Sequence, residues 1–249
     1  MTVEAYTPKV NWINTTLSSQ GLSMDFENAK VLELFGNAGQ LLADPENVVK
    51  QENYTVFDYS QEALDQGIED YPDVDFRMWN HHNQMNNPSG NINEALPFVG
   101  DEKFDFIFTW MKTANLDPEI LDSITQECYE HLNPGGVIIW GIFVREVALN
   151  YFIVRRTHEY GMLEPTLIEQ SEDCKWVTLI DNDVVFLDTE RVPTDGDNAF
   201  MESTHFTLFW RNKSLVERLE SLLPDATVYS RSLPPMWSIQ NPFVIKKPE

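Results

Sequence analysis

Short apolar runs alternate with amphipathic stretches along the first half of the chain. Four strands are predicted there, at 31–34, 54–57, 74–79 and 104–109. Ser60 is a residue type that caps helix N-termini, and Glu62-Ala63-Leu64 follows it, so a helix is expected after the second strand. Gln40-Leu41-Leu42 is expected to open a helix after the first strand. This alternation is typical of βαβ units and predicts a mostly parallel sheet.

A helix and a central strand are predicted next. Asp117-Pro118-Glu119 combines an N-cap residue, a first-turn proline and an early acid, which together mark a helix start. Apolar residues keep helical spacing from Ile120 to Leu132, and Asn133-Pro134-Gly135-Gly136 is expected to stop the helix. The continuous apolar run 137–143 predicts a strand that is covered on both faces.

The region 144–205 is less regular and is expected to form an insertion or lid, with a helix over its first residues. Within it, apolar runs at 176–180 and 184–187 flank Asp181-Asn182-Asp183, which favours a hairpin. The chain is then expected to form a strand, a helix and two further strands, at 206–210, 213–223, 227–229 and 243–245. No linker-like stretch divides the sequence, so residues 1–249 are predicted to be one domain, with a helical segment at 1–30.

Glycine and polar residues follow several predicted strands directly, at 35–39, 58–60, 80–82 and 109–112. Open parallel sheets bind ligands beyond the carboxyl ends of their strands, so these residues form the candidate site. Asp58 lies 19 positions after Gly39, and an acid at about this distance can accept hydrogen bonds from both hydroxyls of a ribose. The alternative is an aspartate that caps the following helix. The pattern predicts a nucleotide-like ligand.

Charge and cysteine content restrict the partners. The net charge is −23, from 40 acidic and 17 basic residues, so phosphate backbones and anionic membranes are repelled. A cationic substrate or a basic partner is compatible with this charge. Two cysteines, no basic and apolar leader, and no run of about 18 apolar residues indicate a cytoplasmic protein without a disulfide framework. The five histidines show no metal-binding spacing, so no metal is expected.

The stretch from Val31 to Gly39 resembles the first motif of class I S-adenosylmethionine-dependent methyltransferases. In that family an acidic residue ends the first strand and a Gly-x-Gly-x-Gly loop follows. Glu33 matches the acid and Gly39 matches the last glycine, whereas Phe35 and Asn37 stand where the first two glycines are usual. Other stretches similar to family motifs follow in order, at 56–64, 104–108, 131–139 and 243–248. The resemblance covers about 31–144 and 206 to the end.

This resemblance implies a three-layer Rossmann-like sandwich. Its seven-stranded sheet is expected to be mostly parallel, with an antiparallel C-terminal strand and an insertion after strand five. The implied activity is methyl transfer from S-adenosylmethionine to an oxygen or nitrogen of a small-molecule acceptor, with S-adenosylhomocysteine as product. The cofactor-binding residues that it implies are Glu33, Phe35, Gly36, Asn37, Gly39, Asp58, Tyr59, Asn80, His81, Thr109 and Trp110. No catalytic residue is assigned, and a homodimer is left open.

The altered glycine loop leaves alternatives open. Glycine lets backbone approach the cofactor and adopt positive φ, which Phe35 would hinder and Asn37 would tolerate. A methyltransferase-like module that binds or assembles without catalysis is therefore the second hypothesis. A nicotinamide-dependent reductase is the third, but Leu42 replaces the third glycine of its turn, and no tyrosine has a lysine four positions on.

Overall fold

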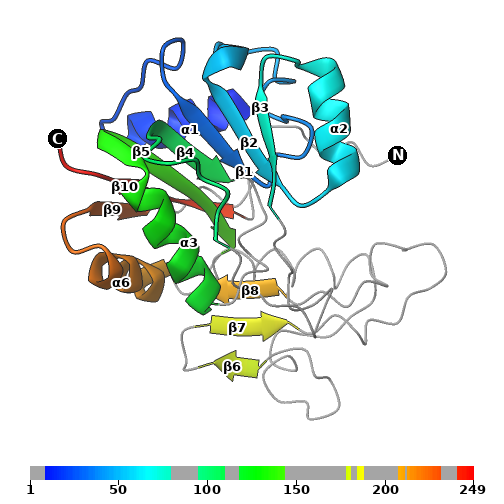
Figure 1. The fold of residues 1–249 in the computed structure, drawn as a ribbon. Coiled ribbons are helices and arrows are strands. Elements are labelled where there is room, and N and C mark those ends of the chain that lie inside the picture. Colours follow the sequence, from blue (N-terminus) through cyan, green and yellow to red (C-terminus); the bar gives the residue numbers. More distant parts are fainter. Residues whose placement is uncertain are drawn as a thin grey trace, which may run out of the picture.

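A seven-stranded sheet forms the centre of the protein in the computed structural model, which describes residues 9–79, 95–109, 118–143, 178–180, 184–187, 207–210, 212–230 and 240–249 (Figure 1). Its order is β3-β2-β1-β4-β5-β10-β9. The strands are β1 (Val31–Leu34), β2 (Tyr54–Asp58), β3 (Asp75–Met78), β4 (Phe104–Thr109), β5 (Leu132–Phe143), β9 (Thr227–Ser230) and β10 (Gln240–Lys246).

Strand direction confirms the predicted mostly parallel sheet. The strands from β3 to β5 pair in parallel, and β10 is antiparallel to both of its neighbours, β5 and β9. In chain order, the sheet begins with β1, continues outward to β2 and β3, and then returns to β4 on the other side of β1. The β1–β4 boundary is thus the switch point at which open α/β sheets bind ligands.

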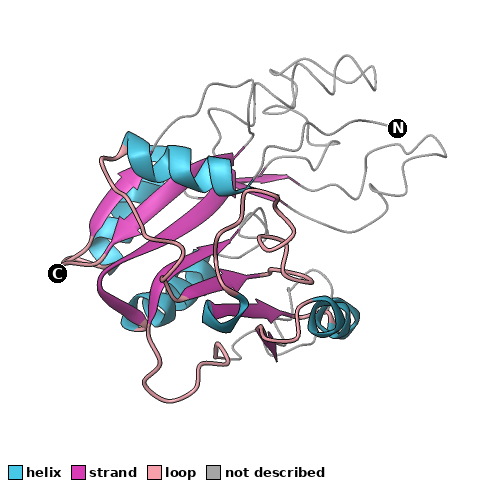
Figure 2. Ribbon diagram, turned by 90° about the horizontal axis from the view of Figure 1, so that it is seen from above, coloured by secondary structure: helices cyan, strands magenta, loops and turns pink. Residues whose placement is uncertain are grey.

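Helices cover both faces of the sheet (Figures 1 and 2). They are α1 (Lys9–Ser19), α2 (Gln61–Asp70), α3 (Pro118–Glu130) and α6 (Asn212–Leu222), and a short 3-10 helix, Gln51–Asn53, precedes β2. Successive strand residues point to opposite faces. In β1, Leu32 and Leu34 therefore join a core with α3 and α6, whereas Val31 joins a second core with α1. This arrangement confirms the three-layer sandwich.

Most of the predicted elements are present within a few residues of their expected bounds. Ser60 caps α2 as expected, because its hydroxyl accepts a hydrogen bond from the Ala63 N–H at 3.3 Å. The helix predicted from Gln40 is wrong, since the chain forms turns there. The predicted stop at 133–136 is also wrong: α3 ends at Glu130, and β5 already begins at Leu132. The register shift between β4 and β5 near Phe104 accommodates this early start.

A second sheet has the order β6-β7-β8, from Thr178–Ile180, Val184–Leu187 and Thr207–Trp210. The antiparallel pairing of β6 with β7 confirms the predicted hairpin, and β8 contacts β5 of the main sheet. The helix expected from Val144 and the rest of the insertion lie outside the described residues. In the N-terminal segment α1 is helical, whereas residues 22–30 are not. None of the helices in the described ranges is long and apolar enough to cross a membrane.

Candidate functional site at the carboxyl ends of the strands

The carboxyl ends of β1, β2 and β4 meet at one edge of the main sheet. Leu34 lies in register with Phe57 on one side and with Thr109 on the other. The fold therefore brings the loop after β1 together with Asp58 and Thr109. Asn80, His81 and Trp110, which were also predicted as site residues, lie outside the described residues.

The loop after β1 has left-handed backbone at the three positions where the methyltransferase motif has glycine. The φ angles are 56° at Phe35, 55° at Asn37 and 82° at Gly39. Asparagine tolerates this region, but for phenylalanine it costs about 1–2 kcal/mol. The loop thus has a conformation suited to glycine at two positions that are occupied by other residues.

Gly36 is required by packing and has no positive φ. A Cβ atom at Gly36 would lie 2.8 Å from Cγ1 of Val56 and 2.9 Å from Cγ of Glu33. Real Cβ atoms essentially never come this close to a neighbouring heavy atom. The glycine that the loop retains therefore lets it pass directly over the side chains of β1 and β2.

The Phe35 ring is accommodated in the core. It is 6% exposed and belongs to the same core as Leu34 and Phe57. Its centroid lies 5.0 Å from that of Trp79, the residue that follows β3. Backbone hydrogen bonds join the same strand ends, from Phe35 N to Phe57 O at 2.7 Å and from Trp79 N to Asp58 O at 2.8 Å. The aromatic pair thus connects the ends of β1 and β3.

Asp58 is buried and holds two backbone segments. One carboxylate oxygen accepts from the Asn37 N–H at 2.8 Å, and the other accepts from the Ser60 N–H at 2.9 Å. Asp58 therefore fixes the loop after β1 against the start of α2. A carboxylate has about four acceptor positions, so two are left for a ligand. Tyr59, the next residue, is exposed.

Glu33 points to the other face of the sheet, toward α1. One of its carboxylate oxygens accepts hydrogen bonds from the Tyr54 hydroxyl and, at 3.4 Å, from the Leu41 N–H. The other lies 3.8 Å from Nζ of Lys9, and both side chains are buried. Burial raises the pKa of Glu33, which Lys9 and the Tyr54 hydroxyl partly offset. Burial likewise lowers the pKa of Lys9, although Glu33 and Asp44 act in the opposite direction.

Thr109 provides a buried hydroxyl at the switch point. It is fully buried, and within the described part of the chain its Oγ1 has no hydrogen-bond partner. Buried hydroxyls are normally paired because an unpaired one costs free energy. A ligand group at the ends of β1 and β4 would supply such a partner.

Sequence reasoning missed several residues that shape this site. Trp79 and Tyr54 were assigned only to strands and Gln40 only to a helix start, and no motif pointed to Lys9. Their roles follow from contacts between segments far apart in the chain, which no local pattern reveals. Among the described residues, no three His, Cys, Asp or Glu side chains are grouped to hold a metal ion.

No family model matches this sequence, and a comparison with curated proteins finds no match. Solved structures do match over almost the whole chain. The glycopeptide N-methyltransferase MtfA in complex with sinefungin has a TM-score of 0.57 at 13% identity, over 98% of this chain and 95% of that one. A SAM-dependent methyltransferase from Methanosarcina mazei has a TM-score of 0.52 at 16% identity, over 89% and 93%.

Streptomyces venezuelae DesVI is similar to the same degree, with a TM-score of 0.52 at 13% identity, over 96% of this chain and 90% of that one. At such identities the likeness is one of fold. The chain therefore has the Rossmann-like fold that S-adenosylmethionine-dependent methyltransferases have.

Proposed function

We propose that this protein binds S-adenosylmethionine at the carboxyl ends of β1, β2 and β4 and transfers its methyl group to a small molecule. S-adenosylhomocysteine is the product, and the accepting atom is oxygen or nitrogen. The observation that carries the proposal is the left-handed backbone at Phe35, Asn37 and Gly39. A loop that keeps a strained conformation without its glycines is expected where the conformation serves binding.

The structural neighbours support the choice of ligand. MtfA was crystallised with S-adenosylmethionine, with S-adenosylhomocysteine and with sinefungin, and DhpI was crystallised with S-adenosylmethionine. Their overall fold is similar to that of the present chain, with TM-scores of 0.57 for MtfA and 0.51 for DhpI. The proposal extends their ligand class to this chain.

Each site residue has a proposed part. The backbone of Asn37 and Gly39 lets the ligand approach β1, and Asp58 accepts from the ribose hydroxyls with Tyr59 beside it. Phe35 and Gly36 shape the loop by packing. Glu33 holds the loop from the α1 side of the sheet by accepting a hydrogen bond from the Leu41 N–H. Thr109 donates its hydroxyl near the transferred methyl group. By their chain position, Trp110 would lie beside Thr109, and Asn80 and His81 would lie near the adenine.

Methyl transfer requires little from the protein beyond alignment of the cofactor with the acceptor. Bound S-adenosylmethionine supplies a methyl group on a sulfonium that is already reactive, so the chain contributes orientation and a site without water. A general base is needed only if the acceptor must lose a proton. We propose that the insertion at 144–205 forms the acceptor pocket or lid, because long segments beside a site often determine specificity.

A second candidate function is a module with this fold that does not catalyse methyl transfer. Two observations favour it: the bulky Phe35 in place of a glycine, and the engagement of both Asp58 oxygens by backbone N–H groups. Such a module would use the acidic surface to bind a basic partner.

Calorimetry on the intact protein separates these functions. Titration with S-adenosylmethionine and S-adenosylhomocysteine is expected to show saturable binding of one molecule per chain, and NADH in the same experiment is expected not to bind. If the folded protein binds neither adenosyl compound, the enzyme proposal fails and the binding module is favoured. If an adenosyl compound does bind, incubation of the protein with S-adenosylmethionine that carries a labelled methyl group and a small-molecule extract follows. Mass spectrometry of the labelled products would identify the acceptor class.

A further inference from the structure

A buried polar cluster lies behind the loop after β1, on the face of the sheet opposite to α3 and α6. Lys9, the first residue of α1, is 3% exposed. Its ammonium donates to Oε1 of Gln40 and lies 3.8 Å from Oε1 of Glu33. A buried lysine is costly unless it is paired, so a side chain of this kind needs the partners that the loop and β1 provide.

The first turn of α1 holds the same loop at a second point. The Val10 N–H donates to Oδ2 of Asp44 at 3.1 Å, and the other oxygen of Asp44 accepts from the Glu46 N–H at 2.9 Å. Glu33, which pairs with Lys9, also accepts from the Leu41 N–H. The start of α1 therefore reaches residues 40, 41 and 44, directly or through Glu33.

The loop itself has little regular structure to keep its shape. Residues 36–44 form turns, with backbone hydrogen bonds such as Gln40 N to Gly36 O at 3.0 Å. Its front contains Asn37, whose N–H is bound by Asp58, and its rear is bound by Lys9 through Gln40. Lys9 and Asp58 therefore bind the same loop at different points.

We propose that Lys9 is a positioning residue that fixes the 36–44 loop in its ligand-binding conformation, so that α1 docking and ligand binding stabilise each other. The coupling follows from linkage, because a ligand that prefers the ordered loop also favours the docked helix. The ligand part of this inference rests on the proposed function. The positioning part concerns the loop alone and is measurable without ligand.

The first test measures amide hydrogen exchange in the ligand-free protein. Lys9→Met keeps the length of the side chain and removes its charge and hydrogen bonds, so exchange within residues 36–44 is expected to accelerate by about tenfold or more. Lys50→Met is the matched control, because Lys50 is exposed and its contacts, with Glu27 at 3.8 Å and with Asn28 at 3.5 Å, lie at the protein surface. Unchanged exchange in a folded Lys9→Met variant would overturn the proposal.

Gln40→Ala serves as a second variant that leaves the buried Lys9–Glu33 pair intact. It removes the acceptor on the loop without isolating a charge, so folding is expected to be retained even if Lys9→Met fails to fold. Faster exchange at 36–44 in this variant supports the positioning role. Exchange at the rate of the Lys50→Met control would contradict it.

The second test adds S-adenosylhomocysteine to the same proteins. The wild type is expected to gain exchange protection in α1 on binding, and Gln40→Ala and Lys9→Met are expected to bind at least about tenfold more weakly than Lys50→Met. Equal affinity in all four proteins would overturn the coupling. If the wild type binds no adenosyl compound, the proposed function fails and so does the coupling, whereas the exchange rates of the ligand-free proteins still decide whether Lys9 holds the loop.

Discussion

Phe35 and Asn37 have backbone conformations that glycine adopts without penalty. The Asn37 side chain is exposed and gains nothing by packing, so its tolerance of the left-handed region explains its presence. Phe35 has no such tolerance. Burying its ring contributes about 1.5–3 kcal/mol, which offsets the strain of about 1–2 kcal/mol. The departure from the glycine motif is thus stable because the ring packs with Trp79 and the core.

This balance predicts an unusual order of stability at position 35. Phe35→Ala loses the ring and keeps the strain, whereas Phe35→Gly loses the ring and relieves the strain. The glycine variant is therefore expected to be more stable than the alanine variant by about 1 kcal/mol, although both are less stable than the wild type. Urea unfolding of the three proteins measures the difference. Ala63→Gly in α2 is the control and should show the ordinary order, with alanine more stable than glycine.

Asp58 is the residue whose loss should affect the ligand most. Asp58→Ala is expected to weaken S-adenosylhomocysteine binding by about 1.5–3 kcal/mol, the range for hydrogen bonds that involve a charged group. It should also destabilise the fold, because the Asn37 and Ser60 N–H groups lose their acceptor. Calorimetry on the folded variant measures the affinity, and Asp65→Ala on the exposed face of α2 is the control. Unchanged affinity would exclude Asp58 from the site.

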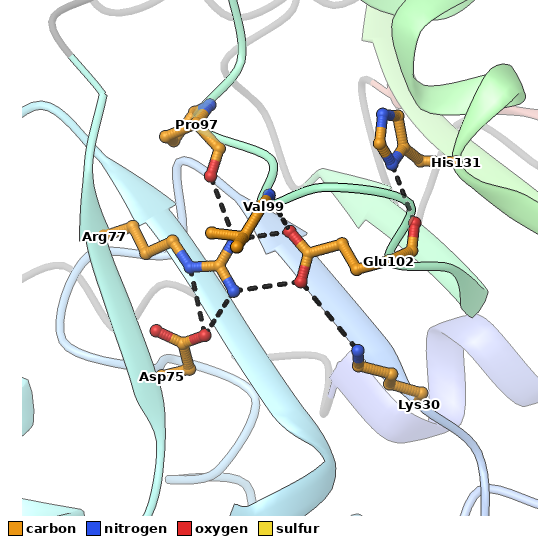
Figure 3. A network of polar contacts seen from close by, with 7 residues as sticks. All are labelled: Lys30, Asp75, Arg77, Pro97, Val99, Glu102 and His131. Carbon is orange, nitrogen blue, oxygen red and sulfur yellow. Dashed lines mark hydrogen bonds and ion pairs between the residues drawn. The ribbon is translucent and has the colours of Figure 1, made fainter.

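At the scale of elements, a polar network ties the segment before β4 to its neighbours (Figure 3). The Arg77 guanidinium in β3 donates to the carboxylates of Asp75 and Glu102 and, at 2.9 Å, to the Pro97 carbonyl. Glu102 also accepts from the Val99 N–H at 2.7 Å and lies 3.9 Å from Lys30 Nζ. Nδ1 of His131 lies 2.7 Å from the Glu102 carbonyl oxygen. Lys30, Glu102 and His131 lie just before β1, β4 and β5, so these members of the network are at the amino ends of the strands, away from the candidate site.

Glu102 gives the network a pH dependence. Burial alone would raise its pKa, but hydrogen bonds from Arg77 and Val99 and the charges of Arg77 and Lys30 lower the pKa overall. A lowered folded-state pKa contributes stability above the unfolded value, about 4.3, and this contribution is lost as the pH falls through the folded value.

Glu102→Gln is accordingly expected to lower the free energy of unfolding by about 1.5–3 kcal/mol at pH 7. The difference from the wild type should shrink as the pH falls below about 4. Urea unfolding of the wild type and the variant at pH 7 and at a pH below about 4 measures the difference in the free energy of unfolding. Glu217→Gln is the control, because Glu217 pairs with Lys213 on an exposed helix face where ion pairs contribute little. A difference that persists at low pH would show that the charge of Glu102 is not its source.

The sequence predicted elements well where hydrophobic periodicity is strong. The strands of the main sheet, the hairpin at Asp181-Asn182-Asp183 and the capped start of α2 all follow from local signals. It failed at Gln40, where apolar residues after a glycine turn suggested a helix. There Leu41 is buried on the α1 side of the sheet. Its backbone N–H is bound by Glu33, and the Gln40 side chain is bound by Lys9, both of which are distant in sequence. Tertiary contacts override local preference at that point.

For the whole molecule, the strand order explains why the proximity of the predicted site residues follows from the sequence and their surroundings do not. Parallel strands place the ends of β1, β2 and β4 at one edge, so residues at 35–39, 58 and 109 come together whatever their identity. Which side chains turn inward depends on packing. Phe35 joins the core of α3 and α6, whereas Glu33 joins the α1 side, and only the assembled layers decide this.

The charge of the whole molecule also limits its stability. At −23, like charges repel throughout the compact state, and this repulsion is screened by salt. The Debye length falls from about 30 Å at 0.01 M salt to about 10 Å at 0.1 M. The melting temperature at pH 7 is therefore expected to rise by several degrees as NaCl increases from about 0.01 M to about 0.5 M.

Calorimetric melting at several NaCl concentrations measures this effect, and the sequence provides an internal control. Near the isoelectric point, about pH 4.4, the net charge approaches zero, so the same change in NaCl should alter the melting temperature far less. Because hydrophobic burial does not disappear at that pH, a salt effect that acted through burial would persist there. A melting temperature at pH 7 that falls with NaCl would instead mean that attractive pairs, such as Arg218 with Asp122 at 2.7 Å, outweigh the net repulsion.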